Sequence, residues 1–362
     1  MQVLPLHQAM LDCGLRSRLI YVSCSDGPSP PAESLALAWL GANPFLFGWR
    51  TASRIERAVQ QADVVHVHGM YTYLNYVAGR CCRRYGKALI YHPHGVLAPA
   101  FRSQGRLKKG VVLWAFERRN SQQVAAYRAL TPAESQHIRE FDPSARVMIV
   151  PNGVHMPQLS THLPEKPTEL AASPAPGLRV FLFLARLSAS KGLDLLIDAF
   201  REVSRQRSDW ALWIAGVDRD GTEAMLRSKL ERSPIPRVSI LGQVSSHEKD
   251  WLLRAADVFV LPSRGEGQSP SVLEAMAYGL PVLLTTTCFY PEAARVGAGK
   301  ECAPIAADLC EAMLSFTHLH RGDLTAMGRR GRELVEHRHD LRQVALALHE
   351  QIEIRLGRQS RL

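Results

Sequence analysis

The stretch that decides the fold runs from residue 257 to residue 285 and reads DVFVLPSRGEGQSPSVLEAMAYGLPVLLT. It opens with an apolar run at 258–261 and passes through a polar, glycine-bearing loop at 263–270. A short helix is predicted at 271–277, because a Gly and a Pro follow it closely, and a second apolar run follows at 282–285. The pattern predicts a strand, a loop, a helix and a strand. The loop would lie at the carboxyl ends of the strands, where open α/β sheets bind ligands.

Two carboxylates in this stretch suggest what the loop could bind. Glu266 lies in the loop and Glu274 lies on the helix, with seven residues between them. A carboxylate can accept hydrogen bonds from two adjacent sugar hydroxyls. The helix N-terminus at 269–271 offers N–H groups and a partial positive charge, which favours an anion. Together these features favour a sugar nucleotide. The alternative is that both glutamates are solvated surface residues, and spacing alone leaves it open.

Outward from this stretch, apolar runs and amphipathic segments alternate along the chain. Strands are predicted at 18–22, 63–67, 88–91, 125–130, 146–150, 179–184, 210–215 and 238–241. Helices are predicted at 1–17, 51–61, 71–85, 107–120, 132–141, 193–206, 223–232, 246–256, 306–319, 324–337 and 341–355. Strands that alternate with helices form crossover units, so the sequence predicts parallel sheets and an α/β fold.

The length and the composition divide this alternation into two domains. The chain has 362 residues, enough for two domains of ordinary size. The Pro, Ser and Thr content of residues 156–177 predicts a linker. The predicted N-terminal domain therefore covers residues 1–155, and the predicted C-terminal domain covers residues 178–340. A last helical segment at 341–362 follows them.

A second candidate site lies early in the C-terminal domain, in the segment FLFLARLSASKGLDLLIDAF. Arg186 follows a predicted strand, and Lys191 precedes a predicted helix. Two cations at such a junction can hold a diphosphate, and the helix dipole adds to their field. Such groups are needed where a reaction releases a phosphate, because negative charge builds on the leaving phosphates as the bond breaks. The alternative is that both are solvated surface cations.

Four histidines lie at the ends of two predicted strands in the N-terminal domain. His66 and His68 end the strand DVVHVHG, and His92 and His94 follow the strand ALIY. Histidines two residues apart on one strand can be metal ligands. Cysteine and acidic partners are missing nearby, so the sequence predicts no metal site. We expect His66 and His92 to be hydrogen-bonded histidines at strand ends.

Charge and composition restrict the partners and the location. The formal charge of +10 favours anionic partners, but no nucleic-acid-binding motif accompanies it, so nucleic acid is not an expected partner. The basic, Trp-containing segment 101–120 could contact an anionic membrane surface or pack against its own domain. No apolar run is long enough to span a bilayer, and the N-terminus does not read as a secretion signal. Seven cysteines without CxxC spacing favour a reducing compartment. We expect a cytoplasmic protein, at the inner face of the membrane if segment 101–120 binds there.

The opening stretch resembles the signature of glycosyltransferase family 4, whose members are retaining enzymes of GT-B fold. The matching residues are Pro262, Ser263, Glu266, Gly267, Glu274, Ala275, Met276, Ala277, Gly279, Pro281 and Val282. The Arg186-Leu187-Ser188 and Lys191-Gly192 frame is also similar to that of the family. Where the family usually has Phe-Gly after Glu-Gly, this chain has Gln268-Ser269. The family contacts the transferred sugar through that loop, so the identity of the sugar is open.

The resemblance implies two Rossmann-like domains facing an interdomain cleft, with the final helix returning to the N-terminal domain. It implies transfer of a hexosyl-type unit, with retention, from a nucleotide diphosphate sugar to a carbohydrate or lipid-linked glycan acceptor. No metal or cofactor is implied, and the departing phosphate would take the acceptor's proton. Under this resemblance Arg186 and Lys191 would hold the diphosphate, and Glu274 would bind the ribose. Gly242 and Gln243 would lie against the base, and the alternative for them is an ordinary Gly turn. Glu266, Gly267, Gln268 and Ser269 would hold the donor sugar. His94 would face the transferred sugar, with His68 as the second choice.

The chain departs from the family at its beginning. Family members start with a strand and a Gly-rich loop, whereas the sequence of this chain predicts a start at the helix that follows them. We therefore expect an N-terminal domain without its first strand. This departure keeps an alternative open, in which a catalytically impaired GT-B protein acts as a binding or regulatory partner. An epimerase of the same fold and a membrane-surface binding module are further alternatives.

Overall fold

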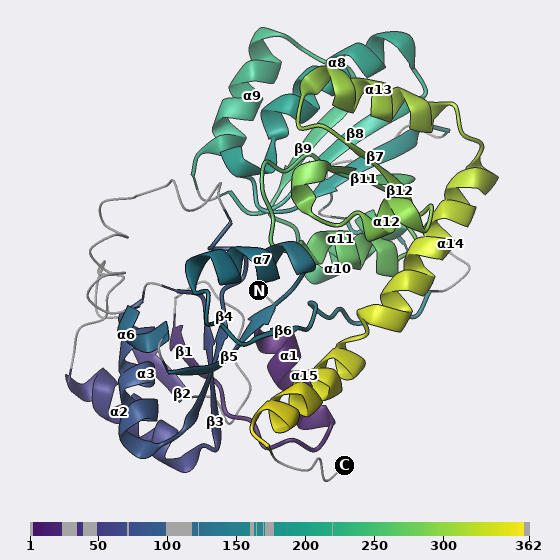
Figure 1. Ribbon diagram of the computed structural model, residues 1–362. Helices are drawn as coiled ribbons and strands as arrows, with labels where there is room; N and C mark the ends of the chain where they lie inside the picture. The colour runs from purple at the N-terminus through teal and green to yellow at the C-terminus, as the bar shows by residue number, and fades with distance from the viewer. Residues whose placement is uncertain are drawn as a thin grey trace. The chain divides into compact units, whose positions relative to one another are not determined.

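The computed structural model describes residues 3–23, 35–38, 49–70, 72–98, 118–121, 123–159, 163, 165–168, 170, 177–218 and 220–357 (Figure 1). The chain divides into two compact units. The first unit comprises Met1–Gly153 together with Leu341–Leu362, and the second unit comprises Val154–Asp340. None of the helices within the described ranges is long and apolar enough to cross a membrane.

The described strands of the first unit form two parallel sheets. Its elements are α1 (Val3–Asp12), β1 (Ile20–Ser23), β2 (Leu35–Ala38), α2 (Trp49–Gln61), β3 (Val64–His68), α3 (Tyr73–Tyr85), β4 (Ala88–His92), α6 (Arg118–Ser121), β5 (Val124–Ala129), α7 (Pro132–Phe141), β6 (Val147–Ile149) and α15 (Leu341–Arg355). One sheet has the order β1-β2, and the other has the order β3-β4-β5-β6. The expectation that this domain lacks its first strand stays a prediction.

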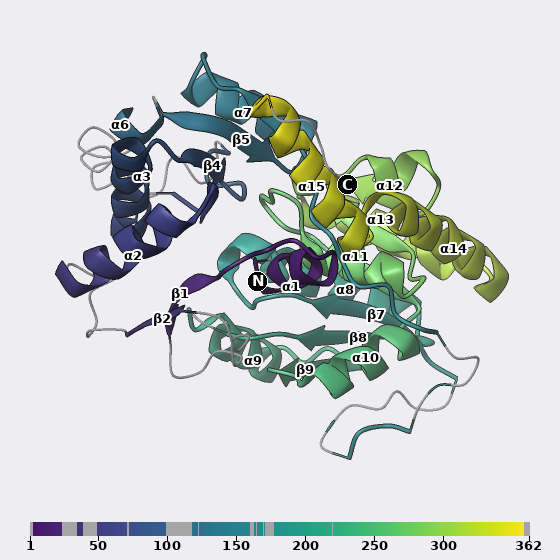
Figure 2. The same cartoon turned by 90° about the horizontal axis from the view of Figure 1, so that it is seen from below.

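Helices cover both faces of the four-stranded sheet (Figures 1 and 2). Alternate residues of β4 point to opposite faces, as the pleat of a strand requires. Leu89 and Tyr91 pack with α2 and α3, whereas Ile90 packs with α1 and α15. The last helix of the chain therefore completes the core of the first unit.

The second unit holds one parallel sheet of six strands in the order β12-β11-β10-β7-β8-β9. Its elements are β7 (Arg179–Leu184), η2 (Ala189–Lys191), α8 (Leu193–Gln206), β8 (Trp210–Ala215), α9 (Thr222–Arg232), β9 (Val238–Gly242), α10 (Ser246–Ala255), β10 (Val258–Leu261), α11 (Pro270–Ala277), β11 (Val282–Thr285), η3 (Thr286–Cys288), α12 (Glu292–Arg295), β12 (Gly299–Cys302), α13 (Ala306–Thr317) and α14 (Arg321–Arg338), where η marks a 3₁₀ turn. Figure 1 shows α8 and α13 on one face of the sheet and α10 and α11 on the other. Strands covered on both faces read as continuous apolar runs, and β8, β10 and β11 are buried throughout.

The strand order creates a switch point between β7 and β10. The chain moves from β7 to β8 on one side and later returns to place β10 on the other side of β7, with Val258 opposite Phe181. The loops that follow these two strands therefore leave the sheet at the same edge in opposite directions. Open α/β sheets bind their ligands at such a point.

Most predicted elements lie within a few residues of the observed ones, and 132–141, 193–206 and 210–215 agree at both ends. Two short strands were missed. The edge strand β12 reads GKEC and is too polar to be recognised from periodicity, and β2 has only four residues, LALA. The predicted helix at 107–120 lies outside the described residues except for its last three positions. Part of the predicted linker packs on the second unit, because Leu170 is buried in the core of that unit.

Candidate functional site

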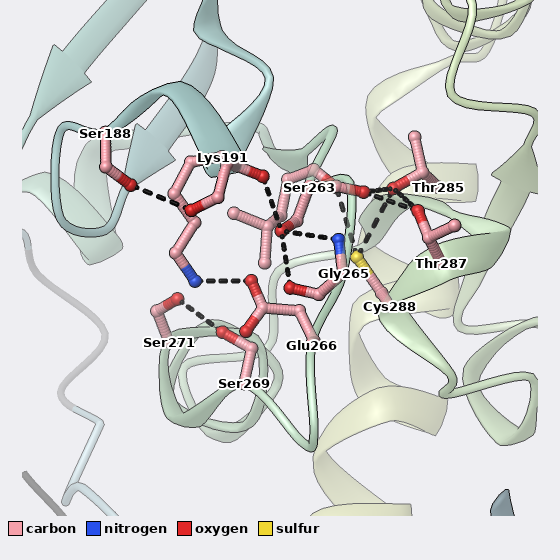
Figure 3. Close-up of polar contacts among 12 residues, drawn as sticks. Ser188, Lys191, Ser263, Gly265, Glu266, Ser269, Ser271, Thr285, Thr287 and Cys288 are labelled. Atoms are coloured by element: carbon pink, nitrogen blue, oxygen red, sulfur yellow. Dashed lines mark hydrogen bonds and ion pairs between the residues drawn. The ribbon is translucent and has the colours of Figure 1, made fainter. Parts of the chain in front are cut away.

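Two loops of the second unit meet at the switch point and form an ion pair (Figure 3). Lys191 ends η2 after β7, and Glu266 lies in the loop after β10. The ammonium of Lys191 donates a hydrogen bond to Oε1 of Glu266. Each side chain is 10% exposed. Two residues 75 positions apart, both predicted from the sequence as donor-binding, are therefore in direct contact.

The backbones of these loops touch beside the ion pair. Gly192 follows Lys191 with a φ of 69°, and a Cβ there would lie 2.0 Å from the carbonyl oxygen of Pro262. The Arg264 N–H donates to the Ser190 carbonyl over 2.8 Å, and the Ser263 hydroxyl donates to the same carbonyl over 3.2 Å. Only glycine permits so close an approach with a positive φ. These contacts fix the distance between the loops.

A bidentate ion pair on the outer side adds to this connection. The Arg264 guanidinium donates to the two carboxylate oxygens of Asp194 over 2.8 and 2.6 Å, and also to the Ala189 carbonyl over 2.8 Å. The hydrogen bond from Arg264 lowers the pKa of Asp194, and its counterpart raises the pKa of Arg264. Arg264 could not be recognised from the sequence, because an exposed Arg carries no signal of its partner.

The end of β11 supports the loop from the opposite side (Figure 3). The Ser263 carbonyl accepts hydrogen bonds from the Thr285 hydroxyl over 2.6 Å and from the Thr287 hydroxyl over 2.5 Å. The Glu266 N–H donates to the Thr287 carbonyl over 3.1 Å. Burial, and then the nearby Glu266, raise the pKa of Cys288 to about 12. Its thiol is therefore neutral at neutral pH and is no nucleophile.

Beyond Glu266 the loop leads into the first turn of α11. Gln268 and Ser269 are buried, and Gly267 is half-buried. Ser269 is the N-cap residue, but its side chain makes no capping hydrogen bond, and its hydroxyl lies 3.1 Å from the Ser271 hydroxyl. The backbone N–H groups of this turn can therefore serve an anion or a sugar hydroxyl.

Glu274 lies on α11 with a lysine partner that the sequence did not reveal. Nζ of Lys249, from α10, donates to Oε1 of Glu274 over 3.1 Å. Both side chains are partly exposed. One carboxylate oxygen of Glu274 thus has a cation beside it, and the carboxylate keeps further acceptor capacity. The separation of 25 residues gives no periodic signal by which the pair could have been found.

The remaining predicted residues of the second unit lie at the same edge of the sheet. Arg186 follows β7 and is exposed, and its neighbour Leu187 donates its N–H to the Val217 carbonyl over 2.9 Å. Gly242 ends β9 with a φ of 67°, and its carbonyl accepts the Gly216 N–H over 2.7 Å. Gln243 follows and is exposed. Among the described residues, no hydrogen bond or ion pair joins the side chain of Arg186 or of Gln243 to Lys191 or Glu266.

In the first unit, four histidines form two hydrogen-bonded pairs. Nδ1 of His66 lies 2.9 Å from Nε2 of His92, and Nδ1 of His68 lies 2.9 Å from Nε2 of His94. The rings of His68 and His92 stack with their centroids 4.2 Å apart. The parallel register of β3 and β4 produces this arrangement, because it places His68 opposite His92. The expectation that His66 and His92 are hydrogen-bonded is confirmed.

These imidazoles are held neutral. Burial, and then the charge of Arg128, lower the pKa of His66 and of His94 to about 4. Burial and the neighbouring imidazoles also lower the pKa values of His68 and His92. Four of their ring nitrogens are used in the two hydrogen bonds between the rings. Within the described residues, no three His, Cys, Asp or Glu side chains are arranged to hold a metal ion.

Both halves of the chain match families of glycosyltransferases. Residues 2–153 match the glycosyl transferase 4-like domain, and residues 166–333 match glycosyl transferases group 1. A GDP-mannose:cellobiosyl-diphosphopolyprenol alpha-mannosyltransferase of Xanthomonas campestris is 28% identical over 264 residues, which are 70% of this chain and 65% of that protein. A lipopolysaccharide core biosynthesis mannosyltransferase of Rhizobium meliloti is 32% identical over 133 residues, which are 36% of this chain and 37% of that protein. The matches thus span less than two thirds of these relatives.

Solved structures with the same fold cover nearly the whole chain. The sucrose-phosphate synthase from Thermosynechococcus elongatus superposes with a TM-score of 0.75 and 18% identity, over 97% of this chain and 92% of that one. Anabaena HepE in complex with UDP and glucose superposes with a TM-score of 0.73 and 16% identity, over 97% and 96%. The predicted fold, two Rossmann-like parallel-sheet domains of the GT-B type, is confirmed.

Proposed function

We propose that this chain, which belongs to the glycosyl transferases group 1 family, moves a sugar from a nucleotide diphosphate sugar to a carbohydrate or lipid-linked acceptor in the synthesis of a cell-envelope glycan. The observation that carries the proposal is the contact between Lys191 and Glu266 at the switch point of the second unit. It places a cation suited to phosphate directly beside a carboxylate suited to sugar hydroxyls.

In this proposal the cations hold the donor diphosphate. An ammonium has three N–H donors, and Glu266 uses one of those of Lys191, so two are left for phosphate oxygens. Arg186 adds a permanent charge from the loop after β7. Glu274 accepts the ribose hydroxyls, and Gly242 and Gln243 lie against the base. Glu266 and the backbone of Gly267, Gln268 and Ser269 hold the donor sugar.

The reaction proposed is transfer with retention. The bond between the anomeric carbon and the phosphate oxygen breaks, and a bond to the acceptor oxygen forms on the same face. The departing phosphate takes the acceptor's proton, so no nucleophile of the protein is required. His94 makes a hydrogen bond to the transferred sugar. Its lowered pKa keeps it neutral at neutral pH.

A screen of nucleotide sugars for thermal stabilisation tests the proposal, because a ligand that binds the native state raises Tm. Two of the relatives are mannosyltransferases by name, so GDP-mannose is the first donor to try. We expect Lys191→Ala and Arg186→Ala to abolish the shift. Lys229→Ala is the matched control, because Lys229 pairs with Asp198 on the helices. Unchanged nucleotide affinity in Lys191→Ala by calorimetry would refute the phosphate role.

Two further variants test the roles of single groups. Glu274→Ala should weaken binding of the nucleotide more than binding of free sugar phosphate, and equal losses would contradict a ribose contact. His94→Ala should lower turnover more than donor affinity, and an unchanged rate would remove His94 from the site. Donor binding without transfer to any acceptor would instead favour the binding or regulatory partner.

We also propose that the protein works at the cytoplasmic face of the membrane through the basic segment 101–120, of which only residues 118–120 are among the described residues. The supporting observation is the overlap of positive charge with a tryptophan in that segment. Co-sedimentation with anionic vesicles should fall when Lys108 and Lys109 are neutralised. Equal binding of both forms would contradict the proposal.

A further inference from the structure

A buried carboxylate, Glu134, connects two backbone segments beside the histidine cluster. Glu134 is 2% exposed. Oε1 accepts the Gly95 N–H over 2.6 Å, and Oε2 accepts the Leu130 N–H over 2.7 Å. Gly95 lies in the turn after β4, and Leu130 directly follows β5. One carboxylate thus holds the carboxyl ends of two neighbouring strands at a fixed spacing.

This arrangement differs from ordinary helix capping. Thr131 is the N-cap of α7, and its hydroxyl accepts the Glu134 N–H over 3.1 Å. In a capping box the side chain of the glutamate would return to the N–H of the N-cap residue. Here it reaches one residue further back, to Leu130, and across to Gly95. The contact with the Gly95 N–H contributes nothing to the cap of α7, so helix capping does not explain why Glu134 makes that contact.

The turn that Glu134 holds carries His94. His94 has a φ of 55° and Gly95 has a φ of 79°. A non-glycine residue in the left-handed region is strained, and this conformation persists when the surroundings hold it there. The ring of His94 is fixed separately, because Nε2 lies 2.9 Å from Nδ1 of His68. The imidazole is therefore held at its backbone and at its ring by different residues.

Two charged side chains near this turn, Arg128 and Glu134, are buried, and burial of a charge is unfavourable. Arg128 is 2% exposed, and its guanidinium donates to the Val150 carbonyl over 2.8 Å and to the Pro151 carbonyl. Burial raises the pKa of Glu134, while its backbone hydrogen bonds and Arg128 act in the opposite direction. Well-packed apolar residues often stabilise a core as well as buried charged groups do. The position of Glu134 is better explained by what it holds than by stability alone.

We infer that Glu134 is a positioning residue for His94, which it orients through the backbone N–H of Gly95. The inference rests on the proposed function, since it assigns Glu134 to the residue expected to contact the transferred sugar. Glu134 itself touches neither donor nor acceptor. Its loss should let the turn leave the left-handed region, so that His94 presents its ring at the wrong angle.

Glu134→Gln is the variant to test, because an amide keeps the shape but turns a donor toward one of the two N–H groups. We expect kcat to fall at least tenfold, with the donor KM within twofold of wild type. In a His94→Ala background the same substitution should change kcat by less than twofold, because its target is gone. Glu140→Gln, at an exposed position of the same helix, is the matched control and should leave kcat unchanged.

Thr131→Ala separates positioning from helix stability, since it removes the cap of α7 and leaves the contact with Gly95. It should lower Tm without the loss of kcat. Should Glu134→Gln fail to fold, Glu134→Asp keeps the charge beside Arg128 but is too short to reach both N–H groups, and it should show the same loss of kcat. Wild-type kcat in either folded Glu134 variant, or an equal loss in the presence and absence of His94, would overturn the inference.

A spectroscopic measurement keeps the inference separate from the proposed function. The side-chain nitrogen resonances of His94 should shift in Glu134→Gln and stay in place in Glu140→Gln. This result is expected even if no sugar transfer is found. A failure of the proposed function can therefore be distinguished from a failure of the positioning inference. Unmoved His94 resonances in Glu134→Gln would contradict the positioning role whatever the enzyme does.

Discussion

The polar side chains of the two candidate sites, one in each unit, are buried in different charge states. In the second unit a charged pair, Lys191 and Glu266, lies at the switch point of the sheet. In the first unit four imidazoles are held neutral by burial, and the buried side chains of Arg128 and Glu134 lie near them. A permanent charge suits a diphosphate, whereas a neutral ring suits hydroxyl groups. Burial therefore favours the neutral form of the imidazoles, whereas the buried ammonium of Lys191 has a carboxylate partner.

The two sites also differ in what keeps them in place. Backbone contacts between two loops, at Gly192 and Pro262, hold the charged pair. Side-chain hydrogen bonds hold His94. The charged pair should therefore be sensitive to added volume and to loss of a partner, and the histidine cluster should be sensitive to pH.

The largest effect is expected from Lys191→Met. It leaves the Glu266 carboxylate buried without its cation, which typically costs about 3–5 kcal/mol. Hydrogen–deuterium exchange of the second unit measures the loss, and the double variant Lys191→Met/Glu266→Met should recover much of it. A single variant as stable as wild type would show that the pair is not structurally coupled.

Gly192→Ala should follow in size. Its Cβ would lie 2.0 Å from the Pro262 carbonyl oxygen, in addition to the left-handed strain of about 1–2 kcal/mol. Gly221→Ala is the matched control, because Gly221 has a φ of 80° and nothing within 4 Å of the added Cβ. We expect the Gly192 variant to lose more stability and to lose donor binding. Equal losses in the two variants would mean that loop contact is unimportant.

Acid should destabilise the first unit through its histidines. The pKa of His66 is about 4 in the folded chain, below the ordinary value of 6.5. Between these values the unfolded chain binds a proton that the folded chain lacks, so stability falls as pH falls. Each such group contributes about 1 kcal/mol per pH unit in this range. The raised pKa of Glu134 has the opposite sign and offsets part of the effect.

His66→Gln tests this, since glutamine can still bond to His92 but does not titrate. Its loss of stability from pH 6 to pH 5 should be smaller than that of wild type by about 1 kcal/mol. Exchange of the amides of β3 and β4 with deuterium follows the change. Identical slopes for the two proteins would indicate that His66 titrates normally.

The smallest effect is expected from Arg264→Ala. The ion pair with Asp194 is 41% and 42% exposed, and exposed pairs contribute roughly 0.2–1 kcal/mol. A double-mutant cycle with Asp194→Asn measures their coupling, which should shrink at high salt. A coupling well above 1 kcal/mol would show that the loops depend on this outer pair more than on the backbone contact at Gly192.

The sequence alone determined the local features. Alternating apolar and amphipathic segments predicted parallel strands and crossover helices. They could do so because the periodicities of strands and helices, 2 and 3.6 residues, are local properties of the sequence. The same letters placed Arg186, Lys191, Glu266 and Glu274 in loops and helices that follow strands. Their proposed roles stay predictions.

The tertiary structure decided which of these residues meet. The contact of Lys191 with Glu266 requires that β10 pair with β7, and the pairing of His68 with His94 requires the register of β3 on β4. Neither strand pairing can be predicted from a local sequence pattern, because any apolar strand can lie beside another. The same holds for Lys249 beside Glu274 and for Glu134 beside Gly95. Strand order and register depend on the packing of the whole core, and they alone bring distant polar groups within hydrogen-bond distance.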